Sequence, residues 1–187
     1  MKIRGDTLMS VGSDGPGHGA GMIDITDKPP VRRIAAASGM IKLKESTIEA
    51  IRNNRIIKGD ALTTSRIAAI LAVKDTPRQI PMCHQIPITS IDVDFSFEPG
   101  SPGLGIIRAK VTVTSVGKTG VEMEALAGVS SALLNIWDMV KYLEKDETGN
   151  YPDTEISDIR VLEKMKEAVQ SNCDGAPPQQ SARHSIK

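Results

Sequence analysis

The chain has 187 residues, 40% of them hydrophobic, which is enough for one domain with its own core but cramped for two. Its 23 basic and 23 acidic residues balance and only 3% of residues are aromatic, so the composition favours neither nucleic acid nor an anionic membrane as a partner. Without a signal-peptide pattern, a long apolar run or a cysteine framework (Cys83 and Cys173 lie far apart), the sequence predicts a cytoplasmic protein.

The two ends of the chain differ in composition from the middle. Residues 1–21 are rich in glycine, and residues 170–187 contain Pro177-Pro178-Gln179-Gln180, so we expect a disordered N-terminal arm and a disordered C-terminal tail. A single α+β domain over residues 22–169 remains, and any catalysis would belong to it.

Two helices are predicted first. Ser46-Thr47-Ile48-Glu49 resembles a capping box, which predicts a short helix from Ser46 to about Asn53. Gly59 or Asp60 begins the next helix, and Pro77 is expected to stop it.

The hydrophobic period then changes to two. Apolar and polar residues alternate over 88–97 and again over 107–115, and a Pro-Gly-rich turn over 99–103 separates the two runs. We therefore expect an antiparallel hairpin with one polar face.

A long helix from Thr119 to about Glu144 and a strand over 155–161 complete the pattern. The helix carries a buried-type stripe made up of Val121, Ala125, Val129, Ala132, Leu133, Ile136, Val140 and Leu143. Together these elements predict an α+β fold, with a ferredoxin-like antiparallel sheet packed on one face by two or three helices.

Asp138, Lys141 and Lys145 form a second stripe on this helix. At this spacing an ammonium group can keep a carboxylate ionised while both face a substrate. The alternative is a solvated surface ion pair that contributes only about 0.3 kcal/mol to stability. Residue spacing alone does not exclude it.

Three further runs contain candidate ligands but are ambiguous singly. Gly117-Lys118-Thr119 is no P-loop, because Thr112 stands where that motif needs glycine, although a helix N-terminus beside Lys118 could bind an anion. Cys83-His84 could be a reactive pair or merely structural. Lys58-Gly59-Asp60 with Arg66 could be an anion clamp or the start of a helix.

Taken in order, these runs resemble one family. Six segments within about residues 22–164 are similar to the cyclic pyranopterin monophosphate synthases (molybdenum cofactor biosynthesis protein C). They are Met22-Ile23-Asp24-Ile25-Thr26, 33–39, 58–61, 82–84, 117–126 and Trp137-Asp138-Met139-Val140-Lys141. The segments 141–146 and Tyr151-Pro152 are similar to the archaeal branch.

The resemblance implies a reaction and a substrate. Family members convert (8S)-3′,8-cyclo-7,8-dihydroguanosine 5′-triphosphate, a cyclised GTP, to cyclic pyranopterin monophosphate and pyrophosphate. A triphosphate calls for several cations, and the candidates are Arg33, Lys58, Lys118, Lys141 and Lys164. The expected cofactor is none, with Mg²⁺ as the one ion that could accompany the triphosphate.

It also implies site residues and an assembly. Asp138 would be the acid or base and Lys141 its partner, with Lys58 and Lys164 assisting. The substrate pocket would be lined by Met82, Cys83, His84, Met123 and Glu124, with Glu122 less favoured because residues two apart cannot share a helical face. No protein-bound metal is expected. The family forms hexamers, as trimers of dimers, so Arg33 and His84 could serve a neighbouring chain's Asp138.

Two other classes remain as alternatives. The chain could be a non-catalytic oligomer of the same fold that binds a nucleotide or pterin. It could also be a plain interaction domain, which would leave the clustered lysines and glutamates without an explanation.

Overall fold

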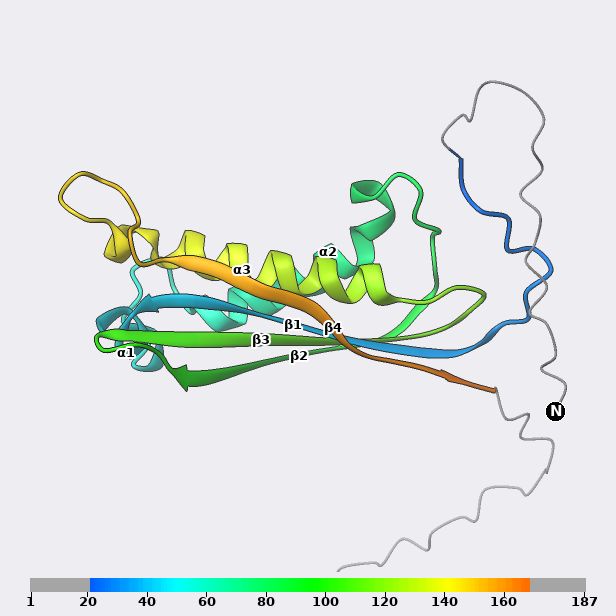
Figure 1. The fold of residues 1–187 in the computed structure, drawn as a ribbon, viewed down its shortest axis with the longest axis horizontal. Helices are drawn as coiled ribbons and strands as arrows, with labels where there is room; N and C mark the ends of the chain where they lie inside the picture. The colour runs from blue at the N-terminus through cyan, green and yellow to red at the C-terminus, as the bar shows by residue number, and fades with distance from the viewer. Residues whose placement is uncertain (1–20, 169–187) are drawn as a thin grey trace, which may run out of the picture.

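The computed structural model describes residues 21–168, and its elements fold into a sheet covered by helices on one face (Figure 1). The predicted arm and tail therefore fall outside the described residues, apart from Gly21. The elements in chain order are β1 (Val31–Lys44), α1 (Glu45–Arg52), α2 (Ala61–Gln79), β2 (Ile88–Pro99), β3 (Leu104–Gly117), α3 (Glu122–Glu144) and β4 (Glu155–Glu167).

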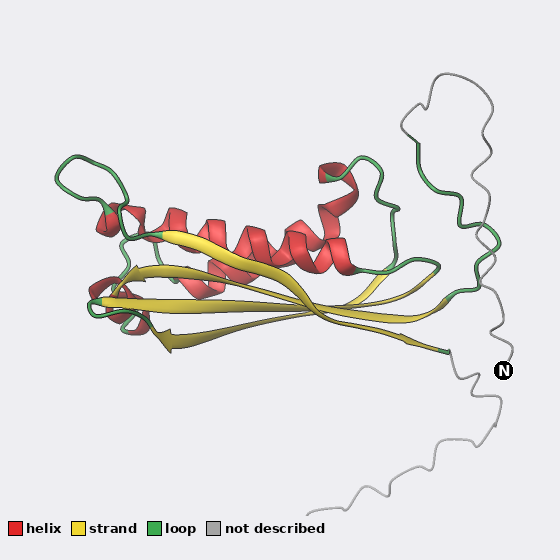
Figure 2. Ribbon diagram, in the orientation of Figure 1, coloured by secondary structure: helices red, strands yellow, loops and turns green. Residues whose placement is uncertain are grey.

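The sheet has four strands in the order β2-β3-β1-β4, and each neighbouring pair is antiparallel. Helices α2 and α3 pack against each other over one face, while α1 lies at one end of the sheet (Figure 2). Apart from the additional short helix α1, the chain has the β-α-β-β-α-β order and the strand order of the ferredoxin-like arrangement, so the predicted fold class is confirmed.

Strand β1 is the one large element that the sequence pattern did not predict. It lies in the interior of the sheet, paired with both β3 and β4. Five consecutive residues from Ala35 to Gly39 are buried, so the strand has no polar side that would produce a period of two. Small side chains are needed there: a Cβ atom on Gly39 would approach Leu133 and Val129 of α3 to 2.9 Å.

The predicted start of α1 and the predicted end of α2 are wrong. Helix α1 starts at Glu45 with Lys44 at its N-cap and no side-chain cap, so Ser46 does not form the expected capping box. Helix α2 does not stop at Pro77 but continues to Gln79. Proline removes one hydrogen bond and bends a helix rather than always ending it, and Figure 1 shows the last turns of α2 turning away from α3.

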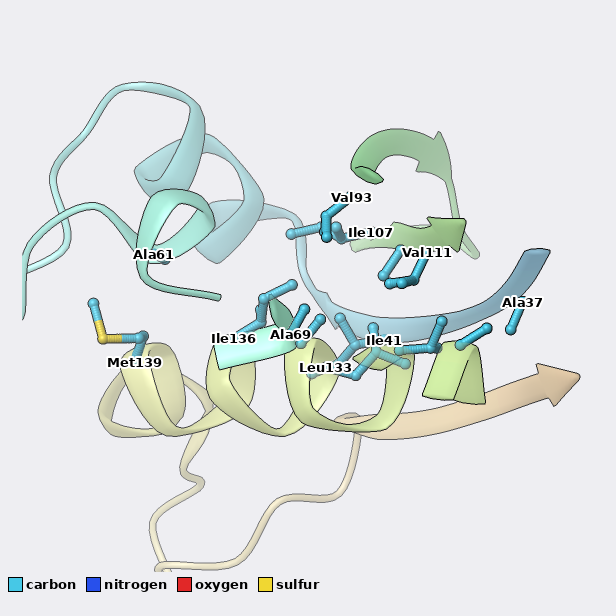
Figure 3. Close-up of a cluster of buried hydrophobic side chains, with 14 of the residues drawn as sticks. Ala37, Ile41, Ala61, Ala69, Val93, Ile107, Val111, Leu133, Ile136 and Met139 are labelled. Carbon is cyan, nitrogen blue, oxygen red and sulfur yellow. The ribbon is translucent and has the colours of Figure 1, made fainter. Parts of the chain in front are cut away.

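The core lies between α3 and the sheet, as the helical stripe predicted. Leu133 and Ile136 of α3 are fully buried and face Ile41 and Val111 in the sheet (Figure 3). The remaining predicted stripe residues are also buried except Leu143, which is partly exposed. The other elements match in kind but differ in length: β3 and β4 are longer than predicted, and α3 begins at Glu122 rather than Thr119. Among the described helices, none has the length and apolarity needed to span a bilayer.

Candidate active site

One cluster of charged side chains lies near the C-terminal end of α3. The Asp138 carboxylate accepts a hydrogen bond from Lys141 Nζ at 2.7 Å and another from Lys58 Nζ at 2.8 Å. Lys58 Nζ also donates to the Asp138 carbonyl oxygen at 2.7 Å. We call these three residues the Asp138 cluster.

The two ammonium groups set the charge state of this cluster. Hydrogen bonds from Lys141 and then from Lys58 lower the pKa of Asp138 from 3.8 to about 2. The same carboxylate raises the pKa of Lys141. Asp138 is therefore ionised and Lys141 protonated at neutral pH in the free protein, and the cluster carries a net positive charge suited to phosphate.

The cluster combines residues from a helix and from a turn. Asp138 and Lys141 lie three residues apart on α3, as predicted, whereas Lys58 comes from the turn between α1 and α2. Lys145, the third residue of the predicted stripe, does not join them, because it follows the last turn of α3 in an extended conformation. The helix ends there.

The Lys58 turn is built by its neighbours. Asp60 caps α2 by accepting from the backbone N–H groups of Leu62 and Thr63, both at 3.0 Å, which confirms the helix-start interpretation. Arg66 does not form a clamp with Lys58. Its guanidinium donates to the Val93 carbonyl oxygen and lies over a phenyl ring of β2.

A second group of predicted residues surrounds a cavity of about 330 Å³ at the other end of α3. The residues around it include the predicted Met82, Cys83, His84, Glu122, Met123 and Lys164, together with Ile80, Thr119 and Gly120, which the sequence analysis did not single out as site residues. We call this the Cys83 pocket. It joins the segment after α2, the turn before α3 and strand β4.

Glu124 lies behind this pocket rather than on its wall. It is 2% exposed, and its Oε1 is 3.7 Å from Cys83 Sγ, while Oε2 meets no hydrogen-bond donor within residues 21–168. Burial raises the pKa of Glu124, and burial together with the nearby Glu124 raises the pKa of Cys83. The helical geometry thus sends Glu122 to the pocket and Glu124 inward, opposite to the preference that the sequence suggested.

Lys164 and Glu122 both line the Cys83 pocket and form an ion pair with each other. Lys164 comes from β4, where it is paired with Ala35 of β1. Gly120 leaves room for the carboxylate, since a Cβ atom at that position would overlap the Glu122 oxygens. A carboxylate and an ammonium are therefore presented together to any occupant of the pocket.

The remaining predicted cations hold backbone segments beside the pocket. Arg33 donates to the carbonyl oxygens of Gly117 and Lys118, at 3.0 and 3.1 Å. Lys118 Nζ donates to the Thr26 carbonyl oxygen at 2.6 Å, and His84 Nε2 is 2.8 Å from the carbonyl oxygen of Ile23. In this conformation Arg33 and Lys118 support the turn before α3 and the N-terminal segment.

The two groups of residues are far apart within one chain. Asp138 lies about 24 Å along α3 from Glu122, at ~1.5 Å per residue. A side chain from each end cannot reach the same reacting atom. The sequence named nearly all the residues of both groups but could not say that they form two separate clusters.

No group of three or more His, Cys, Asp or Glu side chains within residues 21–168 is arranged to hold a metal ion.

Comparison with known proteins agrees with the motif order. Residues 22–167 match the model of the MoaC family. The chain is 59% identical over 148 residues, 79% of its own length and 90% of the relative's, to a protein of Methanococcoides burtonii named "probable cyclic pyranopterin monophosphate synthase". Proteins with the same name in Methanosphaerula palustris (61% over 145 residues, 78% and 91% coverage) and Aeropyrum pernix (54% over 148 residues, 79% and 98% coverage) are also similar. The chain belongs to the MoaC family.

Proposed function

We propose that the chain is a cyclic pyranopterin monophosphate synthase of molybdenum cofactor biosynthesis, a phosphorus-oxygen lyase that converts (8S)-3′,8-cyclo-7,8-dihydroguanosine 5′-triphosphate to cyclic pyranopterin monophosphate and pyrophosphate. Family membership and the names of the relatives support this reaction. The observation that carries it in the structure is the Asp138 carboxylate held between Lys58 and Lys141.

The charge state of the Asp138 cluster suggests how its members take part. Asp138 is ionised, so it enters as a base or as an electrostatic partner. Lys141 enters as a proton donor or phosphate ligand, because Asp138 raises its pKa. If Lys141 acts as a base, it must first transfer its proton, and Lys58 is the second ammonium available to stabilise developing negative charge.

The Cys83 pocket is the proposed binding site for the rest of the substrate. It has apolar walls from Met82 and Met123 and a charged pair from Glu122 and Lys164, which suits a flat polar ring. Arg33 and Lys118 would bind phosphate after giving up their carbonyl partners. We expect no resident cofactor, and Mg²⁺ would enter only with the triphosphate.

Each complete site would combine the Asp138 cluster of one chain with the Cys83 pocket of another. The separation of about 24 Å within one chain supports this arrangement. Exposed Leu71 and Leu134 lie beside neighbouring hollows on the α2–α3 face, and Asp138 borders the second hollow. Apolar side chains at that position favour a homo-oligomer, and a cytoplasmic hexamer built from dimers is the proposed assembly.

The reaction is tested by incubating purified protein with the cyclised triphosphate and measuring pyrophosphate and pterin product. Formation of both products supports the synthase. Tight binding of the triphosphate without product would instead make the chain a nucleotide- or pterin-binding oligomer.

The shared site is tested by assembling two inactive variants together. In a mixture of Asp138→Asn and His84→Ala chains, random pairing should restore about a quarter of the wild-type sites, because half of the dimers are hybrid and each hybrid has one intact site. Mixing Asp138→Asn with Lys141→Ala is the matched control and should restore none. Equal failure of both mixtures would place each site within one chain.

A further inference from the structure

The hydroxyl of Tyr142 contacts the turn that carries Lys58. It accepts a hydrogen bond from the backbone N–H of Ile57 at 3.1 Å. Ile57 directly precedes Lys58, and Tyr142 directly follows Lys141 on α3. The contact therefore joins the Lys58 turn to the helix that carries the other two members of the Asp138 cluster.

Other contacts anchor the residues that lead into the turn. Arg55 N–H donates to the Ala50 carbonyl oxygen at 2.8 Å, and Ile56 is buried at 6% exposure. The Ile57 side chain is 80% exposed and packs little. Gly59 has φ of +104°, a conformation that side-chain-bearing residues rarely adopt, so the chain reverses immediately after Lys58.

Asp138 alone holds Lys58 weakly. The side chains of this ion pair are 38% and 52% exposed, and solvent and salt screen such pairs. A phosphate group would also compete with Asp138 for the Lys58 ammonium. A tether through the Ile57 backbone would persist when the Lys58 side chain changes partners.

We propose that Tyr142 is a positioning residue for Lys58. Asp138 and Tyr142 are four residues apart on α3, so both lie on the face turned toward the Lys58 turn. The helix thus holds Lys58 twice, at its ammonium through Asp138 and at its backbone through Tyr142. The inference rests on the proposed function, in which Lys58 assists the reaction.

Tyr142→Phe removes this hydrogen bond and keeps the ring. With the cyclised triphosphate as substrate, kcat should fall about two- to tenfold, the range expected for one hydrogen bond, with KM changed less than about twofold. In a Lys58→Gln background, where the side chain to be positioned is gone, Tyr142→Phe should change kcat by less than about 1.5-fold. Tyr151→Phe is the matched control, because it removes the hydroxyl of the chain's other tyrosine while keeping that ring's edge contact with Trp137.

An equal fall of kcat in both backgrounds would assign Tyr142 a purely structural effect and overturn the inference, as would an unchanged kcat in the Tyr142→Phe single variant. Amide hydrogen exchange over residues 55–60 needs no turnover. Exchange at Ile57 should be faster in Tyr142→Phe than in the parent or in Tyr151→Phe, and unchanged exchange would also overturn the inference. If the parent forms no product while exchange at Ile57 responds as expected, the proposed function fails but the tether remains.

Discussion

The two ends of α3 each present a carboxylate, but in opposite surroundings. Asp138 is half exposed and hydrogen-bonded by two ammonium groups, which lower its pKa to about 2. Glu124 is buried, the Cys83 thiol donates a hydrogen bond to its Oε1, and burial raises its pKa. Two carboxylates on one helix thus have pKa values shifted in opposite directions.

The difference shows that hydrogen bonds from ammonium groups can lower the pKa of a carboxylate even when its side chain is exposed to water. Exposure to water alone would leave Asp138 near the ordinary pKa of 3.8, and its displacement is caused first by Lys141 and then by Lys58. At Glu124 the loss of water dominates, since the hydrogen bonds that lower the pKa do not offset burial. The surroundings therefore favour the charged form of Asp138 and disfavour the charged form of Glu124.

The largest expected effect is the loss of turnover when Asp138, near the C-terminal end of α3, is neutralised. Asp138→Asn should lower turnover by at least about 100-fold, because it removes an ionised group that takes part in proton transfer. Its half-exposed position predicts an unchanged circular dichroism spectrum. Asp75→Asn is the control, since Asp75 forms the same kind of i,i+3 pair with Arg78 on α2. Near-normal turnover of Asp138→Asn would remove Asp138 from the proposed reaction.

The next largest effect is expected on stability, from the middle of α3, where the helix packs against the sheet. Leu133 is fully buried, so Leu133→Ala should lower the free energy of unfolding by about 2–5 kcal/mol. The adjacent Leu134 is 61% exposed, and Leu134→Ala should cost less than about 0.5 kcal/mol in a dissociated chain. Urea denaturation at matched low protein concentration compares them, and equal losses would contradict the burial pattern.

Glu124→Gln tests the buried end through pH. Because the folded pKa lies above the unfolded value of about 4.5, the contribution of Glu124 to stability is fully present below pH 4.5 and is lost as pH rises through the folded pKa. Glutamine does not titrate. The parent should therefore lose stability relative to the variant as pH rises above 4.5, measured by urea denaturation between pH 4 and 8, and parallel curves would contradict the raised pKa.

The smallest effect is expected from an exposed ion pair whose members belong to neither the Asp138 cluster nor the Cys83 pocket. Arg32 and Glu167 are each 48% exposed, so Glu167→Gln should change the free energy of unfolding by less than about 0.5 kcal/mol and leave turnover unchanged. This variant sets the scale for an ion pair without a catalytic partner. If Glu167→Gln lowered turnover as much as Asp138→Asn, the loss of activity would depend on removing any negative charge and not on the position of Asp138.

Local patterns predicted the elements in which one face is buried. The long stripe of α3 and the alternation in β2 and β3 were readable because their polar faces remain exposed. Strand β1 could not be predicted in this way because consecutive residues, and not alternate ones, are buried over Ala35–Gly39. Helix α2 continues for two residues past Pro77, because a proline removes one backbone hydrogen bond without always ending a helix.

The site was predictable to a different extent at each end. The spacing of Asp138 and Lys141 predicted their ion pair, but Lys58 lies 80 residues earlier and only the family resemblance associated it with them. Lys145 was wrongly included, because it lies one residue beyond the end of α3 at Glu144 and its backbone is extended. The inward direction of Glu124 depends on the rotation of α3 against the sheet, which residue spacing does not give.

The length of α3 has a consequence for how this chain can change over evolution. Inserting a single residue between Glu122 and Asp138 would turn Asp138 by about 100° and shift it by ~1.5 Å, whereas four residues would nearly restore its direction but add about 6 Å. Insertions and deletions inside the helix are therefore expected to be selected against as strongly as changes in the charged residues. The loop between α3 and β4 can vary in length without altering the spacing, so it is the natural place for the chain to grow.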